Sequence, residues 1–145
     1  ISCWLGGTVG YQSRDLPKYF GETPSRDLGL VSTEGRHTIP LEDGRPEGVL
    51  AVDGSYYEFV SVEERGSSNA AVFEAHELEV GREYYLIMST SSGLYRYDIG
   101  DVVRCNGFVG QAPLLEFLHK EGQCADMEGE KLSGSQVAQA VQVAS

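Results

Sequence analysis

Short runs of apolar residues, separated by turn-forming residues, fill the chain between positions 28 and 118. Runs of about four to eight residues that are rich in Val, Ile, Leu, Tyr and Phe and bounded by Gly, Pro, Asp or Ser are typical of β-strands. An Asp-Gly pair, Asp53-Gly54, separates two of these runs and favours a hairpin between them. The predicted strands are residues 28–32, 37–41, 48–52, 56–62, 83–90, 94–97, 102–106 and 114–118.

Helical patterns are confined to the two ends of the chain. Residues 8–20 are compatible with a short, irregular helix, although Pro17 lies inside the segment. Residues 135–144 place Val137 and Val141 four positions apart among alanines and glutamines, which favours a helix. These patterns predict an α+β fold, mainly an antiparallel or barrel-like β unit with a helix near the N-terminus and a helical element at the end. A domain boundary is expected between 120 and 131, where the pattern changes.

The charge of the chain excludes several classes of partner. The 145 residues include 22 acidic and 11 basic ones, for a formal net charge of −11. Neither nucleic acid nor an anionic membrane is an expected partner, because both require a basic surface. No apolar run approaches the ~20 residues of a membrane span, and no signal peptide is visible, so a cytoplasmic location is expected. The three cysteines have no metal-ligand spacing and are interpreted as reduced thiols.

The common motifs of phosphate binding and nucleophilic catalysis are absent. The sequence contains no GxxxxGK[ST], no GxGxxG between a strand and a helix, and no GxSxG. Gly6-Gly7-Thr8 is interpreted as a loop rather than a phosphate site. The histidines His37, His76 and His119 have no catalytic spacing and are expected at the surface or partly buried.

Two short clusters of polar residues remain as candidates for a binding site. Ser32-Thr33-Glu34 places two hydroxyls and a carboxylate at the end of an apolar strand, where they could hold Mg²⁺ and phosphate oxygens or simply cap a turn. Asp101 follows a glycine between two predicted strands, where its carboxylate could bind the vicinal hydroxyls of a ribose or simply form part of a β-turn. The residues alone leave both alternatives open.

A longer ordered pattern then carries a family resemblance. The string GLYRYDIGDVVRCNGFVGQAPLLEFLHK, followed by GEKLS, resembles the Gretchen-Hagen-type acyl-acid amido synthetases and their bacterial relatives. That family belongs to the adenylate-forming superfamily, together with luciferases and acyl-CoA synthetases. The resemblance covers nearly the whole chain and is most specific over residues 93–132.

The resemblance implies roles for named residues. Ser32-Thr33-Glu34 is similar to the family's [ST]-[ST]-Glu motif, which implies that Glu34 faces Mg²⁺ and the adenylate and that Ser32 and Thr33 contact the nucleotide. Asp101 matches the aspartate that binds the ribose of ATP or AMP, and Lys131 matches a lysine that meets the phosphate. Lys120 stands where many relatives carry an arginine. One position departs from the family's pattern: Leu30 stands where the family often has an aromatic residue that stacks on adenine.

The resemblance also implies an activity and an organisation. The implied activity is an ATP-dependent ligase that activates a carboxylic acid as an acyl-adenylate and transfers it to an amine, such as an amino acid. Residues 1–119 would be the β-rich end of the large adenylating domain, and residues 120–145 the hinge and the start of the small C-terminal domain. The chain would then be part of a longer enzyme whose remaining sequence supplies the phosphate loop. Two alternatives stay open, namely a free-standing, non-catalytic binding module and an acyl-CoA ligase.

Overall fold

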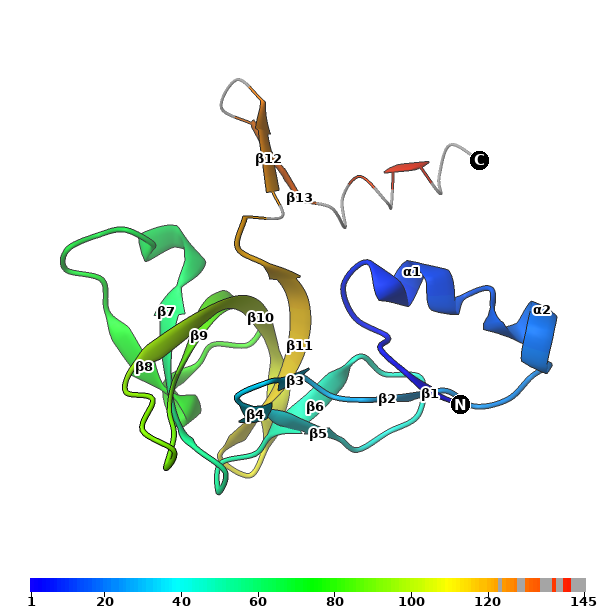
Figure 1. Ribbon diagram of the computed structural model, residues 1–145, viewed down its shortest axis with the longest axis horizontal. Helices are drawn as coiled ribbons and strands as arrows, with labels where there is room; N and C mark the ends of the chain where they lie inside the picture. Colours follow the sequence, from blue (N-terminus) through cyan, green and yellow to red (C-terminus); the bar gives the residue numbers. More distant parts are fainter. Residues whose placement is uncertain (123, 128–129, 134–136, 138–139, 142–145) are drawn as a thin grey trace.

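The computed structural model describes residues 1–122, 124–127, 130–133, 137 and 140–141. Within these residues, seven strands form one antiparallel sheet, with β5 at one edge and β8 at the other. The spatial order of the strands is β5-β6-β11-β10-β9-β7-β8. Their bounds are Thr38–Pro40 (β5), Glu47–Leu50 (β6), Tyr56–Ser61 (β7), Val72–Glu74 (β8), Glu83–Ser89 (β9), Tyr97–Val109 (β10) and Ala112–Lys120 (β11). Figure 1 shows that the sheet is strongly curved, as expected for a barrel-like unit.

The hydrophobic core is built mainly from residues of β7, β9, β10 and β11. Phe59, Tyr84 and Leu86 are all 1% exposed or less. Tyr84 makes edge-to-face ring contacts with Phe59 at 6.3 Å and with Phe73 at 5.9 Å, an arrangement that aromatic rings prefer. Two short 3₁₀ helices, Val62–Glu64 and Ala75–Glu77, follow β7 and β8.

The N-terminal segment forms a separate layer beside β11 (Figure 1). β1 (Ser2–Cys3) pairs in parallel with β2 (Arg26–Asp27), and two short helices, α1 (Val9–Ser13) and α2 (Leu16–Phe20), lie between them in the chain. Pro17 stands in the first turn of α2, where a backbone amide has no partner within the helix and proline is tolerated. The predicted helix over 8–20 is therefore two helices that meet near this proline.

Two features of the strand prediction are wrong. Asp53-Gly54 does not close a hairpin, because β6 pairs with β5 and β11 while β7 pairs with β8 and β9. The residues 94–97 do not form a strand of their own: residues 94–96 form a turn in which Arg96 has a φ of 46°, and Tyr97 begins β10.

β10 runs without interruption through Gly100, which lies between two of the strands predicted from the sequence. The register with β9 shifts between Asp98 and Val102, and Gly100, inside this irregularity, has a φ of 73°. Only glycine adopts that conformation without steric cost. The bulge therefore keeps Asp101 on a paired strand, and not in the β-turn that was one of the two alternatives for this residue.

The predicted fold class is confirmed by this mainly antiparallel sheet with helical structure near the N-terminus. After β11, the strands β12 (Cys124–Met127) and β13 (Glu130–Ser133) form a hairpin. The helix predicted over residues 135–144 lies largely outside the described residues. Of the helices that the structure describes, none is both long and apolar enough to span a membrane.

Candidate functional site

A cavity of about 440 Å³ lies where the N-terminal segment meets the end of β11. Its wall is completed by β3 (Val31–Ser32), by the turn that joins β3 to β4 (Gly35–Arg36), and by the middle of β10. The N-terminal segment approaches closely because it contains glycine: a Cβ atom at Gly6 would lie 2.9 Å from the carbonyl oxygen of Phe117. Among the lining residues are Trp4, Gly6, Thr8, Asp27, Leu30, Ser32, Thr33, Glu34, Asp101, Phe117 and Lys120.

Asp101 and Lys120 form the charged floor of this cavity. They are direct register partners on β10 and β11, and Lys120 Nζ donates to Asp101 Oδ1 at 3.0 Å. The Asp101 side chain is 7% exposed, whereas that of Lys120 is 52% exposed. Burial raises the pKa of Asp101, and the hydrogen bond and charge of Lys120 oppose that rise. The pair thus presents a buried acceptor beside a cation that reaches solvent.

Ser32, Thr33 and Glu34 form the tip of the β3–β4 hairpin, on the same cavity. Thr33 Oγ1 donates to Glu34 Oε2 at 3.0 Å, and the Glu34 amide donates to Ser32 Oγ at 3.2 Å. The Ser32 hydroxyl, followed by the backbone amide of Glu34 and the Thr33 hydroxyl, lowers the pKa of Glu34. Glu34 is therefore an anion at neutral pH, held at the tip of the hairpin beside the two hydroxyls of Ser32 and Thr33.

His37 lies directly behind this hairpin and is 1% exposed. Its Nε2 is 2.7 Å from Ser32 Oγ, and its Nδ1 is 3.2 Å from the Tyr57 hydroxyl. The expectation of a surface or partly buried position is thus wrong for His37. Sequence spacing missed it because its partners come from two different segments, one of them 20 residues away.

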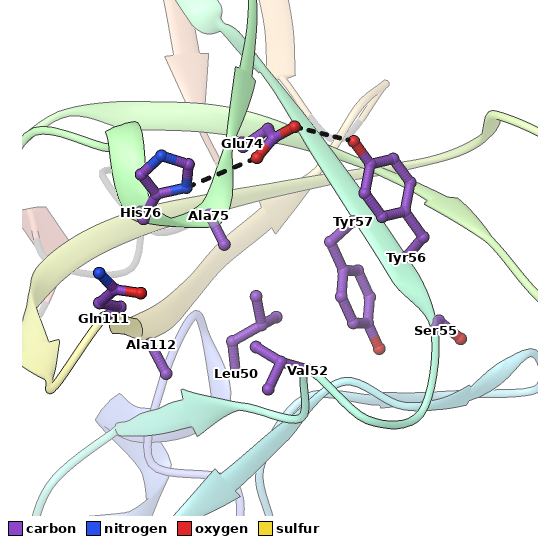
Figure 2. A pocket seen from close by; sticks show the side chains of 10 residues that line it. All are labelled: Leu50, Val52, Ser55, Tyr56, Tyr57, Glu74, Ala75, His76, Gln111 and Ala112. Carbon is purple, nitrogen blue, oxygen red and sulfur yellow. Dashed lines mark hydrogen bonds and ion pairs between the residues drawn. The ribbon is translucent and has the colours of Figure 1, made fainter.

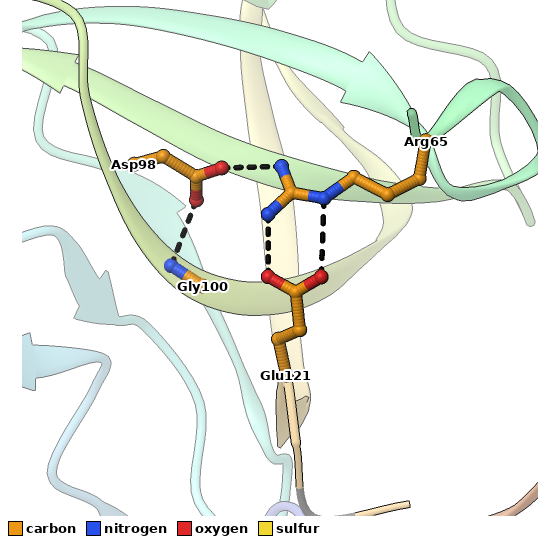
Figure 3. A network of polar contacts seen from close by, with 4 residues as sticks. All are labelled: Arg65, Asp98, Gly100 and Glu121. Carbon is orange, nitrogen blue, oxygen red and sulfur yellow. Dashed lines mark hydrogen bonds and ion pairs between the residues drawn. The ribbon is translucent and has the colours of Figure 1, made fainter. Parts of the chain in front are cut away.

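Arg65 forms a network at the point where the chain leaves the sheet (Figure 3). Its guanidinium donates to both carboxylate oxygens of Glu121, the residue after β11, and to Asp98 at the bulge of β10. It also lies 4.1 Å from the centre of the Tyr85 ring. The Glu121 amide donates to the carbonyl of Gly100 at 2.6 Å. The network therefore ties together the two strand segments that carry Asp101 and Lys120.

A second cavity, of about 280 Å³, lies away from these residues and is lined by the side chains in Figure 2. Its lining is mainly apolar, with Leu50 and Val52 on one side. Three of the polar side chains on it contact one another, because Glu74 accepts from Tyr56 at 3.3 Å and lies 3.6 Å from His76. None of the site residues predicted from the sequence lines it.

The structure brings five of the six predicted site residues to one cavity, namely Ser32, Thr33, Glu34, Asp101 and Lys120. The sixth, Lys131, lies on β13 opposite Asp126, and its side chain lies outside the described residues. Sequence reasoning did not assign Trp4, Thr8 or Asp27 to the site. Gly6-Gly7-Thr8 was the one available signal, and it was interpreted as a loop.

The donor set is compatible with Mg²⁺ only in company with a phosphate ligand. In the part of the chain that the structure describes, no three His, Cys, Asp or Glu side chains converge on one point. Mg²⁺ is commonly held by one or two carboxylates plus phosphate oxygens and water. Glu34, ionised and accessible from the cavity, fits the part of the protein carboxylate.

Comparison with known proteins places the chain in a family. The model of the GH3 family central domain matches residues 48–120. Indole-3-acetic acid-amido synthetase GH3.4 of Arabidopsis thaliana is 34% identical over 137 residues, which are 90% of this chain and 23% of that protein. Indole-3-acetic acid-amido synthetase GH3.8 of Oryza sativa subsp. indica is 37% identical over 146 residues, with coverage of 96% and 24%.

Solved structures agree with this assignment. The GH3.15 acyl acid amido synthetase superposes with a TM-score of 0.84 at 26% identity, over 99% of this chain and 26% of that one. Its complex with 2,4-DB gives a TM-score of 0.82 at the same identity. The chain thus spans about a quarter of the length of the proteins it matches. Since the central-domain model covers half of the chain, and the relatives extend the match to nearly all of it, the chain belongs to the GH3 family.

Proposed function

We propose that this chain carries part of the nucleotide site of an ATP-dependent ligase that joins a carboxylic acid to an amine through an acyl-adenylate. The observation that carries the proposal is the convergence of Glu34 with the Asp101–Lys120 pair on one cavity, in a chain of the GH3 family. The relatives are named as acyl acid or indole-3-acetic acid amido synthetases, which supports an amine acceptor.

Each residue has a proposed role that suits its chemistry. Asp101 is a buried acceptor, suited to bind the two ribose hydroxyls of ATP or AMP. Lys120 and the hydroxyls of Ser32 and Thr33 are donors, suited to phosphate oxygens. Glu34 would hold Mg²⁺, which supplies charge that stabilises the phosphates when it is bound. Lys131 is proposed as the cation that meets the phosphate during catalysis.

The proposed reaction has two steps. The carboxylate oxygen of the acid attacks the α-phosphorus of ATP, the bond to the bridging oxygen breaks, and pyrophosphate leaves. The amine nitrogen then attacks the acyl carbonyl carbon, the bond between that carbon and the phosphate oxygen breaks, and AMP leaves with the electron pair of that bond while the nitrogen loses a proton. The chain's own contribution is to hold the nucleotide and to offset the charge that develops on the phosphates.

The proposed organisation keeps the boundary at the end of the sheet. Residues 1–119 would close the large adenylating domain, and residues 120–145 would form the hinge and open the small domain. The family model ends at residue 120, where β11 also ends. The remaining parent sequence would supply the rest of the acid pocket and the phosphate loop, and the proposed location is the cytoplasm.

The proposal is tested by ATP–pyrophosphate exchange with the full-length protein. A panel of acids that includes indole-3-acetic acid and 2,4-DB should contain at least one that drives exchange, and an amino acid should then release AMP. Asp101→Ala should abolish exchange, whereas Asp53→Ala, at an exposed acidic position, should not. Exchange with no acid, or full exchange in Asp101→Ala, would contradict the proposal. Release of AMP by coenzyme A, and not by amines, would instead favour an acyl-CoA ligase.

A further inference from the structure

His37 is held between two hydroxyl groups by its own backbone and by its neighbours. Its amide donates to the carbonyl of Leu30 at 2.8 Å, and its carbonyl accepts from the amide of Ala51 at 2.9 Å. Its ring stands edge-to-face to the Tyr57 ring, with centroids 5.9 Å apart. These contacts fix the imidazole so that one nitrogen faces Ser32 and the other faces Tyr57.

A neutral imidazole has one N–H donor and one bare nitrogen acceptor. Burial lowers the pKa of His37, and the charges of Asp101 and Glu34 oppose that effect only in part. The ring is therefore neutral near pH 7, and its two hydroxyl partners must play opposite roles. Whichever hydroxyl donates to the ring decides which nitrogen carries the proton.

Tyr57 is the better donor of the two. A phenol is a stronger acid than an aliphatic alcohol, so its O–H makes the stronger hydrogen bond to a bare imidazole nitrogen. Burial raises the pKa of Tyr57, and a hydrogen bond with the Ser55 hydroxyl opposes that rise, as a group does that donates to the phenol oxygen. The Tyr57 proton is then directed at His37 Nδ1, which leaves the ring proton on Nε2, facing Ser32.

Ser32 Oγ has its acceptor positions filled in this arrangement. A hydroxyl has two lone pairs and one proton. One lone pair accepts from the Glu34 amide at 3.2 Å, and the other accepts from His37 Nε2. The proton of Ser32 therefore points away from His37, toward the side of the cavity that Glu34 also lines. The Ser32 hydroxyl is the main group that lowers the pKa of Glu34, so without a ligand it donates to the Glu34 carboxylate, and a ligand oxygen would accept the proton in place of that carboxylate.

We propose that His37 is a positioning residue that, as its Nε2–H tautomer set by Tyr57, makes Ser32 a donor to an anionic oxygen of the ligand in the cavity. The identity of the ligand, a nucleotide phosphate, rests on the proposed function. The tautomer of His37 rests on its hydrogen bonds with Ser32 and Tyr57. It extends the site to Tyr57, a residue that lines the second cavity and does not touch the first (Figure 2).

The tautomer is measured directly, without any ligand. Histidine labelled with ¹⁵N in the 145-residue chain gives separate nitrogen signals for its three imidazoles, and His37→Gln assigns those of His37. We expect Nε2–H in the unmodified chain. Tyr57→Phe removes the donor to Nδ1, so the proton should move to Nδ1 and Ser32 should donate to the ring instead. An Nδ1–H signal in the unmodified chain would overturn the inference.

Binding of AMP then tests the consequence for Ser32. Tyr57→Phe and Ser32→Ala should each weaken AMP binding by about tenfold, the loss of one hydrogen bond to a charged group. The double variant should be no weaker than Ser32→Ala alone, because both changes remove the same donor. His37→Gln, whose amide N–H can take the place of Nε2–H, should bind better than His37→Met.

Tyr56→Phe is the matched control, since the Tyr56 hydroxyl bonds Glu74 on the surface. It should leave both the tautomer and AMP binding unchanged. Additive losses from Tyr57→Phe and Ser32→Ala would overturn the inference. Failure of the full-length protein to bind AMP, with the Nε2–H tautomer in place, would instead contradict the proposed function.

Discussion

Lys120 Nζ lies 3.0 Å from Asp101 Oδ1, across a register pair of the two central strands of the cavity wall. The two partners are unequal, because Asp101 is buried and Lys120 is half exposed. A buried carboxylate with one partner stays costly to ionise, so the pKa of Asp101 is raised despite the neighbouring cation. The protein keeps a charge where its own stability would favour a neutral group, which is typical of a functional position.

Asp101→Asn should therefore stabilise the fold while weakening nucleotide binding. The raised pKa means that Asp101 contributes stability below the unfolded-state value of 3.8 and that this contribution is lost as the pH rises through the folded-state pKa. At pH 7 the neutral amide avoids that cost, and we expect a gain of about 0.5–2 kcal/mol in the free energy of unfolding. Urea denaturation at pH 7 and at pH 3 measures the gain, which should vanish at the lower pH. A loss of stability at pH 7 would contradict this assignment.

Glu34→Gln should remove the response to Mg²⁺ and leave stability nearly unchanged. Hydrogen bonds, of which that of Ser32 is the most important, lower the pKa of Glu34. The ionised side chain therefore contributes stability above the unfolded-state pKa of 4.5, and this contribution is lost as the pH falls through the folded-state pKa. Because Glu34 lies at an accessible hairpin tip, the change should be within about 0.5 kcal/mol. Titration of ATP with Mg²⁺ and with EDTA checks the metal: the two affinities should differ in the unmodified chain and converge in the variant. The same Mg²⁺ response in both proteins would exclude Glu34 as the ligand.

The sequence predicted most of the strands and drew attention to two short motifs that the structure brings to one cavity. Glu34 and Asp101 became candidates because their residue types stand in short, ordered motifs. His37 and Arg65 were missed, because each bonds partners that are far away in the chain, and no spacing rule connects them. Asp53-Gly54 is a good local signal for a hairpin between β6 and β7. The structure instead pairs β6 with β11, and Leu50 of β6 and Leu115 of β11 are both buried in the core.

Arg65→Met should loosen the end of β11 and weaken nucleotide binding without unfolding the chain. The guanidinium bonds both Glu121 and Asp98, and these carboxylates raise the pKa of Arg65. We expect a cost of about 1 kcal/mol for a partly exposed network, and Arg65→Lys should recover little, because an ammonium lacks the bidentate fork. Hydrogen exchange should become faster at the Glu121 amide, which bonds Gly100.

Arg104→Met is the matched control for this experiment. Arg104 also pairs with two carboxylates, those of Glu83 at 2.8 Å and Glu116 at 3.9 Å, and is exposed to a similar extent as Arg65. Its partners are not Glu121 and Asp98, the two carboxylates that Arg65 bonds, so its loss should leave exchange at Glu121 and AMP affinity unchanged. Equal effects of the two variants would show that Arg65 acts only through general stability.

Trp4 provides a direct signal for occupation of the cavity. It is the single tryptophan of the chain, lines the cavity and is 48% exposed. A nucleotide that enters should change both the polarity around the indole and its exposure, so AMP should alter the intensity and wavelength of its fluorescence. The change should saturate, and Asp101→Ala should shift the saturation to higher AMP concentration. A spectrum that does not respond to saturating AMP, with binding shown by calorimetry, would place the ligand elsewhere.

Gly100→Ala should be more costly than Gly107→Ala, although both glycines lie on β10 beside a register shift. Gly100 has a φ of 73°, and an added Cβ would lie 3.5 Å from the Cβ of Glu121, so alanine would be strained in its backbone even where space suffices. We expect a loss of about 1–2 kcal/mol in the free energy of unfolding. At Gly107 the backbone is outside the left-handed region, and an added Cβ would make an ordinary contact of 3.7 Å with Leu114, so alanine should be neutral or slightly stabilising.

The two variants also separate the bulge from the strand as a whole. Since Gly100 immediately precedes Asp101 and accepts from the Glu121 amide, relaxation of its backbone should displace the carboxylate and weaken AMP binding. Gly107→Ala should bind AMP normally. Thermal unfolding and AMP titration of both variants measure the two effects. If Gly100→Ala kept full stability and full affinity, the bulge would have no part in placing Asp101, and the geometry of the ribose site would have to be set by Lys120 and Arg65 alone.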